Sequence, residues 1–376
     1  MKKMRVKRLL VDNFRNCQKG DWFFSGGINV LYGHNGEGKT NVIESLYFSA
    51  LGCSHRTFQE DDLINSAADG MGVCVVAEKE DGGETKIVIK KSARRKSKEI
   101  TVDNSKVKPR ELIGQIKAAI FSPEDLKLAK SEPALRRRFI DMQIAQVNSA
   151  YCFSLARYNK ILQQRNKLLA AIKERKMSVN LLEVWDDQLA KEASLILPAR
   201  LKTLLKISRL TAEVYGELSG RREKAGMVYC RREDGSSEFV GEDAENSYCW
   251  YKKGLAARIK KDTENASTGL GPHRDDIFFT LDGLPLKNFA SQGQQRSFVL
   301  ALKIAETMII RDECGEYPIL LLDDALSELD ARRRQKLIDF LSGRIQTFIT
   351  LTEKNLFKDF GRAVFYRVEK GVVSEA

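Results

Sequence analysis

The sequence lacks the features that mark membrane, secreted and zinc-binding proteins. No run approaches the roughly 18 consecutive apolar residues that a membrane-spanning helix needs, and the basic start of the chain has no uninterrupted apolar stretch of the secretory type. The seven cysteines are odd in number and scattered, and neither a CxxC pair nor a His-x₃-His spacing is present. We therefore expect a cytoplasmic protein with reduced thiols, without a disulfide framework or a zinc site.

Apolar and basic residues are plentiful. Hydrophobic residues make up 43% of the 376 positions, which is enough for a large core and excludes global disorder. The net charge is +12, and the segment 129–261 alone carries 26 basic against 16 acidic residues. This excess favours a polyanionic partner, although solvated side chains on long helices explain it equally well.

The order of apolar patterns predicts two α/β segments that flank a helical insertion. We expect strands at 3–13, 22–25, 28–32, 73–78, 86–91 and 118–122, a helix at 39–51 and a hairpin turn at Asp81-Gly82-Gly83. The insertion has apolar stripes of helical spacing at 151–169 and 181–207, and a small strand patch at 227–232. We expect strands again at 277–281, 319–323, 346–351 and 363–368, and helices at 294–311 and 332–341.

These patterns predict an α/β fold of three sequence regions. Residues 1–128 and 262–376 form the two parts of one head, and residues 129–261 form an inserted, mainly helical arm. Because parallel apolar strands must bury both faces, the two ends of the chain are expected to close one sheet.

A phosphate-binding loop is the clearest motif. It matches GxxxxGK[ST], with an expected strand before it and an expected helix after it, so a chance glycine-rich turn is a poor alternative. Glycines let successive backbone N–H groups point at phosphate oxygens, and the helix N-terminus adds partial positive charge. Its residues are Gly33, His34, Asn35, Gly36, Glu37, Gly38, Lys39 and Thr40. Lys39 is expected on the β- and γ-phosphates, and the Thr40 hydroxyl on Mg²⁺.

A second element is the apolar run Ile319–Leu322 that ends in Asp323 and Asp324. Unpaired buried carboxylates are costly, so a cation or a reaction should justify them. We expect Asp323 to hold the Mg²⁺ shell and Asp324 to orient or deprotonate the attacking water. The alternative is that the pair caps the next helix.

Further motifs carry a family resemblance. The signature Ser291, Gln292, Gly293, Gln294 precedes a helix, and LLLDDALSELD follows at 320–330. With CSHRTFQEDDLI at 53–64, FSPEDLKL at 121–128 and GPHRDD at 271–276, the chain resembles the ABC-type ATPase heads of the SMC-like DNA repair proteins, and within them the RecF family. The resemblance covers nearly the whole chain.

The resemblance implies an ATP- and Mg²⁺-dependent switch in which two heads bind ATP between them. Ser291 and Gly293 would then contact the γ-phosphate of the partner's nucleotide, with Asp330 as the D-loop residue. Asp324 and Thr350 stand where transporter ATPases usually have Glu and a switch His, which favours slow hydrolysis. We expect a weak ATPase that DNA stimulates. The implied role is recombinational repair at gaps and stalled forks on the nucleoid, linked to the SOS response, with RecR, RecO and RecA loading.

The DNA contacts are expected among the densest basic clusters. These are Lys90, Lys91, Arg94, Arg95, Arg136, Arg137, Arg138, Arg221 and Arg222. Arg56 and Arg274, next to His55 and His273, either neutralise phosphate charge or pair with Asp275 or Asp276 at a sheet edge. An SMC-type chromosome organiser is the alternative function, and a transporter ATPase subunit a weaker one.

Overall fold

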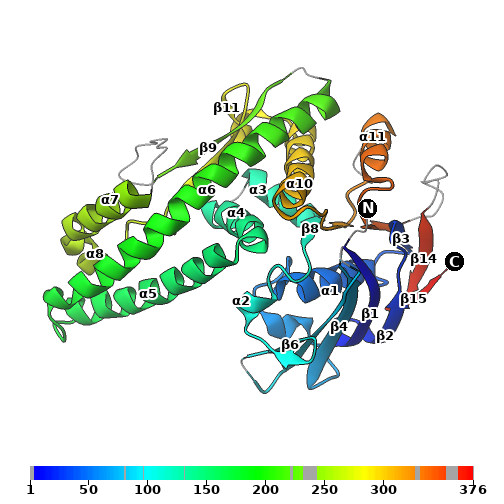
Figure 1. Cartoon of the computed structure of the whole chain (residues 1–376), viewed down its shortest axis with the longest axis horizontal. Helices are drawn as coiled ribbons and strands as arrows, with labels where there is room; N and C mark the ends of the chain where they lie inside the picture. The colour runs from blue at the N-terminus through cyan, green and yellow to red at the C-terminus, as the bar shows by residue number, and fades with distance from the viewer. Residues whose placement is uncertain are drawn as a thin grey trace. The chain divides into compact units, whose positions relative to one another are not determined.

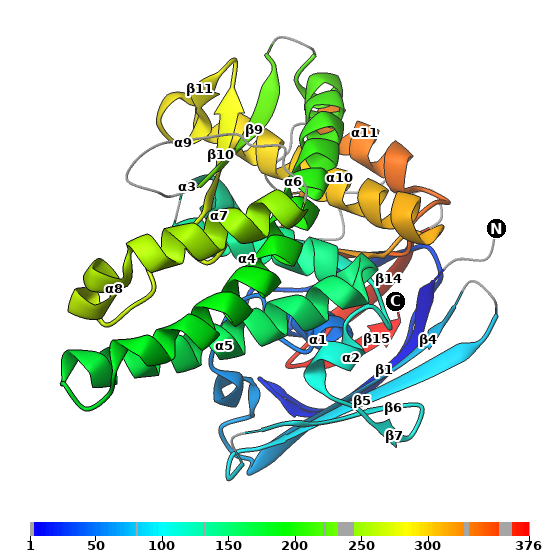
Figure 2. The same ribbon diagram turned by 60° about the vertical axis from the view of Figure 1, so that its left-hand side comes forward.

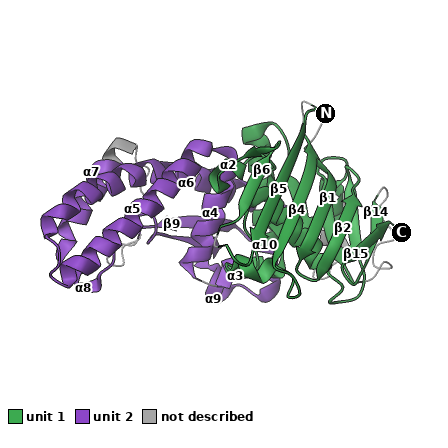
Figure 3. Cartoon of the chain, turned by 90° about the horizontal axis from the view of Figure 1, so that it is seen from below, with its two compact units in different colours: residues 1–127, 299–376 green, residues 128–298 purple. Residues whose placement is uncertain are grey.

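The computed structural model describes residues 4–79, 82–95, 97–130, 132–220, 223–231, 244–326, 331–352 and 363–375. The chain divides into two compact units, residues 1–127 with 299–376 and residues 128–298 (Figure 3). The first boundary is close to the expected one, but the second falls after Phe298 instead of Lys261. The reason is that β10 (Asp276–Leu281) pairs along its whole length with β9 (Ala225–Cys230) of the insertion. Among the described residues, no helix is long and apolar enough to cross a membrane.

A six-stranded sheet in the first unit joins both ends of the chain. Its order is β15-β14-β3-β13-β12-β8, with only the β14–β15 pair antiparallel. The strands are β3 (Ile28–Tyr32), β8 (Ala118–Phe121), β12 (Ile319–Leu322), β13 (Thr347–Leu351), β14 (Val364–Glu369) and β15 (Val372–Glu375). Every residue of β8, β12 and β13 is buried, which explains their apolar sequences. The expectation that the two ends share one sheet is confirmed.

A second, antiparallel sheet comes entirely from the N-terminal region and was not predicted as a separate layer. Its order is β2-β1-β4-β5-β6-β7. The strands are β1 (Arg5–Phe14), β2 (Cys17–Phe23), β4 (Gly70–Glu78), β5 (Glu84–Ser92), β6 (Glu99–Val102) and β7 (Ser105–Lys106). Buried and more exposed residues alternate along β4 and β5, as in a sheet with one covered face. The β4–β5 turn contains Gly82 at φ +86°, while Asp81 lies outside the described residues.

Helix α1 (Lys39–Leu51) has the predicted bounds and packs between the two sheets (Figure 2). It contacts β1, β4 and β5 of one sheet and β8, β12 and β13 of the other. Among its described residues, this unit also contains η1 (Glu60–Leu63), α2 (Pro109–Leu112), η2 (Pro123–Asp125) and α11 (Ala331–Leu341). Two further helices, α3 (Leu126–Lys130) and α10 (Gln292–Cys314), span the unit boundaries.

The second unit is mainly helical, as predicted. Its helices are α4 (Pro133–Val147), α5 (Ser149–Lys173), η3 (Val179–Leu181), α6 (Leu182–Ser219), α7 (Ala244–Ala257), α8 (Ile259–Asn265) and α9 (Leu286–Phe289). Helix α6 continues past the predicted end near Ile207 and past Pro198, and it packs against α5 and α7 (Figure 1). A small sheet of order β11-β10-β9, with β11 at Leu284–Pro285, completes the unit.

Candidate functional site

The phosphate-binding loop lies between the end of β3 and the start of α1, as the motif predicts. Lys39 is buried, and its Nζ donates to the carbonyl oxygens of Gly33 at 2.6 Å and His34 at 2.7 Å. Burial lowers the pKa of Lys39, while the nearby carboxylates of Asp323 and Asp324 oppose this shift. Because the hydrogen bonds of the Lys39 ammonium group go to neutral carbonyl oxygens, this cation can exchange them for an incoming phosphate.

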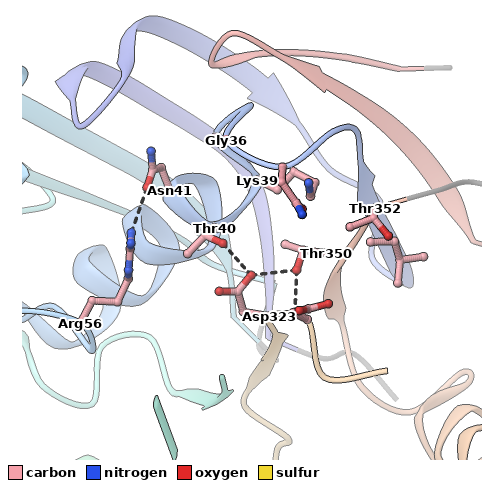
Figure 4. A pocket seen from close by; sticks show the side chains of 12 residues that line it. Gly36, Lys39, Thr40, Asn41, Arg56, Asp323, Thr350 and Thr352 are labelled. Atoms are coloured by element: carbon pink, nitrogen blue, oxygen red, sulfur yellow. Dashed lines mark hydrogen bonds between the residues drawn. The ribbon is translucent and has the colours of Figure 1, made fainter. Parts of the chain in front are cut away.

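Asp323 follows β12 and faces Thr40 across the loop. Because β12 and β13 are parallel neighbours, their carboxyl ends place Asp323 next to Thr350. The Asp323 Oδ1 atom accepts hydrogen bonds from the Thr40 hydroxyl at 3.0 Å and the Thr350 hydroxyl at 2.8 Å (Figure 4). Burial raises the pKa of Asp323, and these two hydrogen bonds oppose the rise.

Asp324 has a strained backbone for a non-glycine residue, with φ +50°. Its backbone N–H donates to the Thr350 Oγ1 atom at 2.8 Å. Thr350 therefore links both aspartates, because its hydroxyl donates to the Asp323 side chain and accepts from the Asp324 backbone N–H.

These groups line one pocket of about 310 Å³ in the first unit. Its lining residues are Asn35, Gly36, Gly38, Lys39, Thr40, Asn41, Arg56, Asp323, Asp324, Thr350, Leu351 and Thr352. Five of the eight predicted loop residues, the two aspartates and Thr350 line this pocket, whereas Gly33, His34 and Glu37 are not among its lining residues. The carboxylate and hydroxyl oxygens of Asp323 and Thr40 are hard donors of the kind that Mg²⁺ prefers.

Arg56 also lines this pocket, and its side chain has partners other than the two aspartates considered from the sequence. Its Nη1 donates to Asn41 Oδ1 at 3.1 Å and lies 3.2 Å from Glu44 Oε2, instead of pairing with Asp275 or Asp276. Glu44 is fully buried, and burial alone would raise the pKa of its carboxyl. Hydrogen bonds from Arg15 and Ser54 and the charges of Arg15 and Arg56 nevertheless hold this pKa below its usual value. Glu44 was not singled out in the sequence, because the motif pattern leaves its position unspecified.

The GPHRDD segment instead lies in the second unit and has structural contacts. His273 is held between the Tyr158 hydroxyl at 2.5 Å and the Thr268 carbonyl at 3.0 Å, and burial lowers its pKa to about 4. Arg274 donates to the same carbonyl of Thr268 at 2.9 Å. The sequence-based alternative that Arg274 pairs with a neighbouring aspartate is replaced by this backbone contact.

The signature segment forms the N-terminus of α10. The Gln294 side chain accepts from the Ser291 backbone N–H at 2.6 Å, and the Ser291 hydroxyl accepts from the Gln294 N–H at 3.3 Å. Ser291, Gln292 and Gly293 are exposed. Glu223, which the sequence did not indicate, accepts from Gln294 Nε2 at 2.5 Å and from the Tyr215 hydroxyl at 2.6 Å. The predicted D-loop residue Asp330 lies outside the described residues.

Two of the residues predicted to contact DNA are buried and already paired. Arg136 is buried and forms a two-bonded ion pair with Asp276 at 2.9 Å, and Lys91 is buried with its Nζ 2.7 Å from Asp61. A buried charge that is already paired does not meet a phosphate backbone.

The other predicted DNA contacts differ in exposure. Lys90, Arg94 and Arg95 are exposed, and Arg94 lies 3.4 Å from Asp69. Arg137 and Arg138 are half-buried, and Arg137 donates to the Asp275 carbonyl at 2.7 Å. Arg221 and Arg222 lie outside the described residues.

Comparison with known proteins gives consistent results. A family model described as the RecF/RecN/SMC N terminal domain matches residues 5–374. The DNA replication and repair protein RecF of Acetivibrio thermocellus is 38% identical over 372 residues, which cover 98% of this chain and 99% of that protein. A solved structure of the recombination mediator protein RecF with ATP, in the RecFOR pathway, matches with a TM-score of 0.92 at 33% identity and covers 100% of this chain and 98% of that one.

A more distant structure shares the fold alone. The Smc head domain of Pyrococcus furiosus matches with a TM-score of 0.58 at 16% identity, over 99% of this chain and 96% of that one. The fold is thus the α/β head of the ABC-type ATPases with an inserted arm, as expected. From its motifs, its fold and its full-length relatives, the chain belongs to the RecF family.

Proposed function

We propose that this chain is an ATP-dependent DNA-binding switch of recombinational repair. The observation that carries the proposal is the convergence of Lys39, Thr40, Asp323 and Thr350 on one pocket at the carboxyl ends of parallel strands. Parallel α/β sheets bind ligands at this edge. The relative with the solved structure is described with ATP, which supports ATP as the ligand here.

The roles of the loop residues follow from the chemistry of phosphate. Backbone N–H groups of residues 33–40 bind the phosphate oxygens, and Lys39 exchanges its two carbonyl partners for the β- and γ-phosphates. Thr40 and Asp323 are the oxygen ligands that fit Mg²⁺, which would supply charge neutralisation of the triphosphate. Arg56 adds a second positive charge at the pocket.

Hydrolysis requires a group that orients the attacking water, and Asp324 takes this role. Thr350 fixes the backbone of Asp324 and the side chain of Asp323 at the same time. Aspartate is one methylene shorter than the glutamate usual in transporter ATPases, so its carboxylate reaches the water less well. We infer slow hydrolysis that DNA stimulates, suited to resetting a switch.

The signature completes the site from a second copy. Ser291 and Gly293 are exposed at the N-terminus of a 23-residue helix, where small residues and the partial positive charge of the helix end suit a γ-phosphate. Gln292 and Gln294 flank them, and Asp330 takes the D-loop position. ATP thus joins two molecules, each of which contributes half of a pocket, and hydrolysis releases them.

DNA is clamped in the ATP-bound dimer. By family membership, RecR and, through it, RecO are the partners, in a path that helps RecA load at gaps and stalled forks during the SOS response. The basic excess of the segment 129–261 supports a polyanionic partner.

Sedimentation with a non-hydrolysable ATP analogue tests this function. Wild-type protein should dimerise with the analogue and remain monomeric with ADP. Lys39→Ala should lose nucleotide binding and dimerisation together, because the phosphates lose their buried cation. Ser291→Ala should bind the analogue with unchanged affinity but dimerise more weakly, since the signature acts across the interface.

The experiment tests two parts of the proposal separately: the site shared between two molecules and the nucleotide pocket within each molecule. A wild-type protein that stays monomeric when saturated with the analogue contradicts the shared-site arrangement. A Lys39→Ala variant that binds ATP normally contradicts the assignment of the pocket itself.

A further inference from the structure

The phosphate-binding loop is held from one side by the turn between β1 and β2. Asn16, in this turn, accepts a hydrogen bond from the Asn41 side-chain amide at 2.7 Å. Its own amide lies 3.4 Å from the carbonyl oxygen of Gly36. Asn16 therefore bridges the middle of the loop and the first turn of α1.

The other side of the loop is held by the turn between β14 and β15, more than 330 residues away in sequence. The Gly371 N–H donates to the Glu37 carbonyl oxygen at 2.8 Å. The Lys370 N–H donates to the Glu37 carboxylate. The C-terminal hairpin thus bonds to both the backbone and the side chain of a loop residue.

The loop and the two turns leave no room between them. A Cβ atom added to Gly38 would lie 2.9 Å from Asn16 Oδ1 and 3.3 Å from Gly371 Cα. A Cβ atom on Gly371 would lie 3.1 Å from both the Asn16 carbonyl oxygen and Cys17 Cα. A Cβ atom on Gly33 would lie 2.3 Å from the carbonyl oxygen of Val368, in β14. Any side chain here must displace the loop or a turn.

From these contacts we propose that Asn16, Lys370 and Gly371 form a clamp that fixes the phosphate-binding loop in its binding conformation. A glycine-rich loop has much conformational freedom to lose, so contacts that fix it beforehand strengthen phosphate binding. The clamp residues act through the loop as positioning residues. The C-terminal hairpin is thereby part of the nucleotide site, which deepens the proposed ATP binding and rests on it.

A matched pair of glycine variants tests the clamp. Gly371 and Gly343 both have positive φ, +79° and +69°, so alanine imposes similar backbone strain at either position. A Cβ atom at Gly343 meets nothing within 4 Å, whereas at Gly371 it meets the backbone of the β1–β2 turn. Only Gly371→Ala should therefore disturb the loop.

The measurement is the dissociation constant of a fluorescent, non-hydrolysable ATP analogue, together with the thermal unfolding midpoint. A loop displaced by a few tenths of an ångström should weaken binding by roughly tenfold in Gly371→Ala. Gly343→Ala should bind like wild type, and its unfolding midpoint should change no more than that of Gly371→Ala, because only backbone strain acts there. Asn16→Ala, which opens space instead of filling it, should also weaken binding, and its KM for ATP should rise more than its kcat falls.

The outcomes distinguish a failure of the clamp proposal from a failure of the proposed ATP binding. If wild-type protein binds no analogue, the proposed function fails. If wild type binds, Lys39→Ala does not, and both Gly371→Ala and Asn16→Ala bind like wild type, the clamp is overturned. Equal weakening by Gly371→Ala and Gly343→Ala also overturns it, because strain alone would then explain the loss.

Discussion

At the scale of single residues, Thr350 has a larger part in the geometry of the site than its position in the sequence suggests. Its one hydroxyl donates to Asp323 and accepts from the Asp324 backbone, so it sets the geometry of both acidic residues. A threonine at the end of a β-strand is common, and sequence gives no sign of such a double role. The prediction that Thr350 belongs to the site came from the family resemblance, and the structure shows its hydrogen bonds to Asp323 and Asp324.

Thr350→Val tests this role. Valine keeps the shape and β-branching but removes the hydroxyl, so Asp323 and Asp324 lose a shared partner. We expect kcat for ATP hydrolysis to fall by about 10- to 100-fold with little change in ATP affinity. Thr347→Val in the same strand, whose hydroxyl donates to the Ile345 carbonyl at 3.2 Å, should keep the wild-type rate. Equal rates for the two variants would contradict the assignment.

His273 makes the stability of the protein depend on pH. A histidine in the unfolded chain titrates near pH 6.5, whereas burial lowers the pKa of His273 to about 4. Between these values the unfolded state binds a proton that the native state does not. The free energy of unfolding should therefore fall as the pH drops from 6.5 to 4, by up to about 3 kcal/mol from this residue.

Urea unfolding at pH 7 and pH 5 measures this effect. His273→Asn should lower stability at both values but reduce the difference between them by about 2 kcal/mol. His55, whose pKa burial also lowers to about 4, should leave a residual dependence of the same sign. An unchanged difference in the variant would show that His273 does not titrate as described.

At the scale of elements, the helices of the second unit are joined by buried arginines. Arg165 of α5 pairs with Asp186 of α6 at 2.6 Å and with Asp262 of α8 at 2.8 Å. Arg200 of α6 pairs with Asp141 of α4 at 2.8 Å. These ion pairs hold specific helices against one another. They also bury some of the basic residues of this segment, so these residues are not exposed at the surface.

Arg165→Leu tests the inner pairs. The substitution leaves two buried carboxylates without their shared cation, so the free energy of unfolding should fall by about 3–5 kcal/mol. Arg157→Ala is the matched control on the same helix, because Arg157 is 56% exposed and pairs with Glu192 near the surface. Its loss should cost about 1 kcal/mol or less. Denaturant titration of both variants compares them, and similar losses would contradict the distinction.

At the scale of the whole molecule, DNA binding depends on basic residues that are exposed. Basic residues in ion pairs therefore have to be left out when the charge pattern is related to DNA binding. The outer face of the antiparallel sheet carries basic residues, but Arg5, Lys7 and Arg8 pair with Glu78, Glu84 and Asp21. Exposed lysines of the helical unit, such as Lys160, Lys167 and Lys202, remain available to phosphates.

Salt dependence of DNA affinity tests the polyanion interaction. With the ATP analogue bound, the logarithm of the association constant should fall linearly with log salt, at a slope of roughly −0.9 per neutralised phosphate. Replacing Lys160 and Lys167 together by Gln should reduce the slope by about 1 to 2. Arg136→Met should change stability instead of the slope. A salt-independent affinity would rule out phosphate contacts as its source.

The sequence by itself determined the local chemistry of this protein. The loop of residues 33–40 and the carboxylates after an apolar strand are contiguous patterns whose conformation is set by nearby residues, so both could be recognised along with the helix that follows the loop. The tertiary structure alone decided which charges are buried, that Arg56 reaches the pocket while Arg274 does not, and that the stretch 262–298 belongs with the arm. It also brought the turn at Lys370–Gly371 against the loop. The contact of this turn with the loop joins residues hundreds of positions apart in the sequence. It depends on the packing of the whole sheet, so a local sequence pattern cannot predict it.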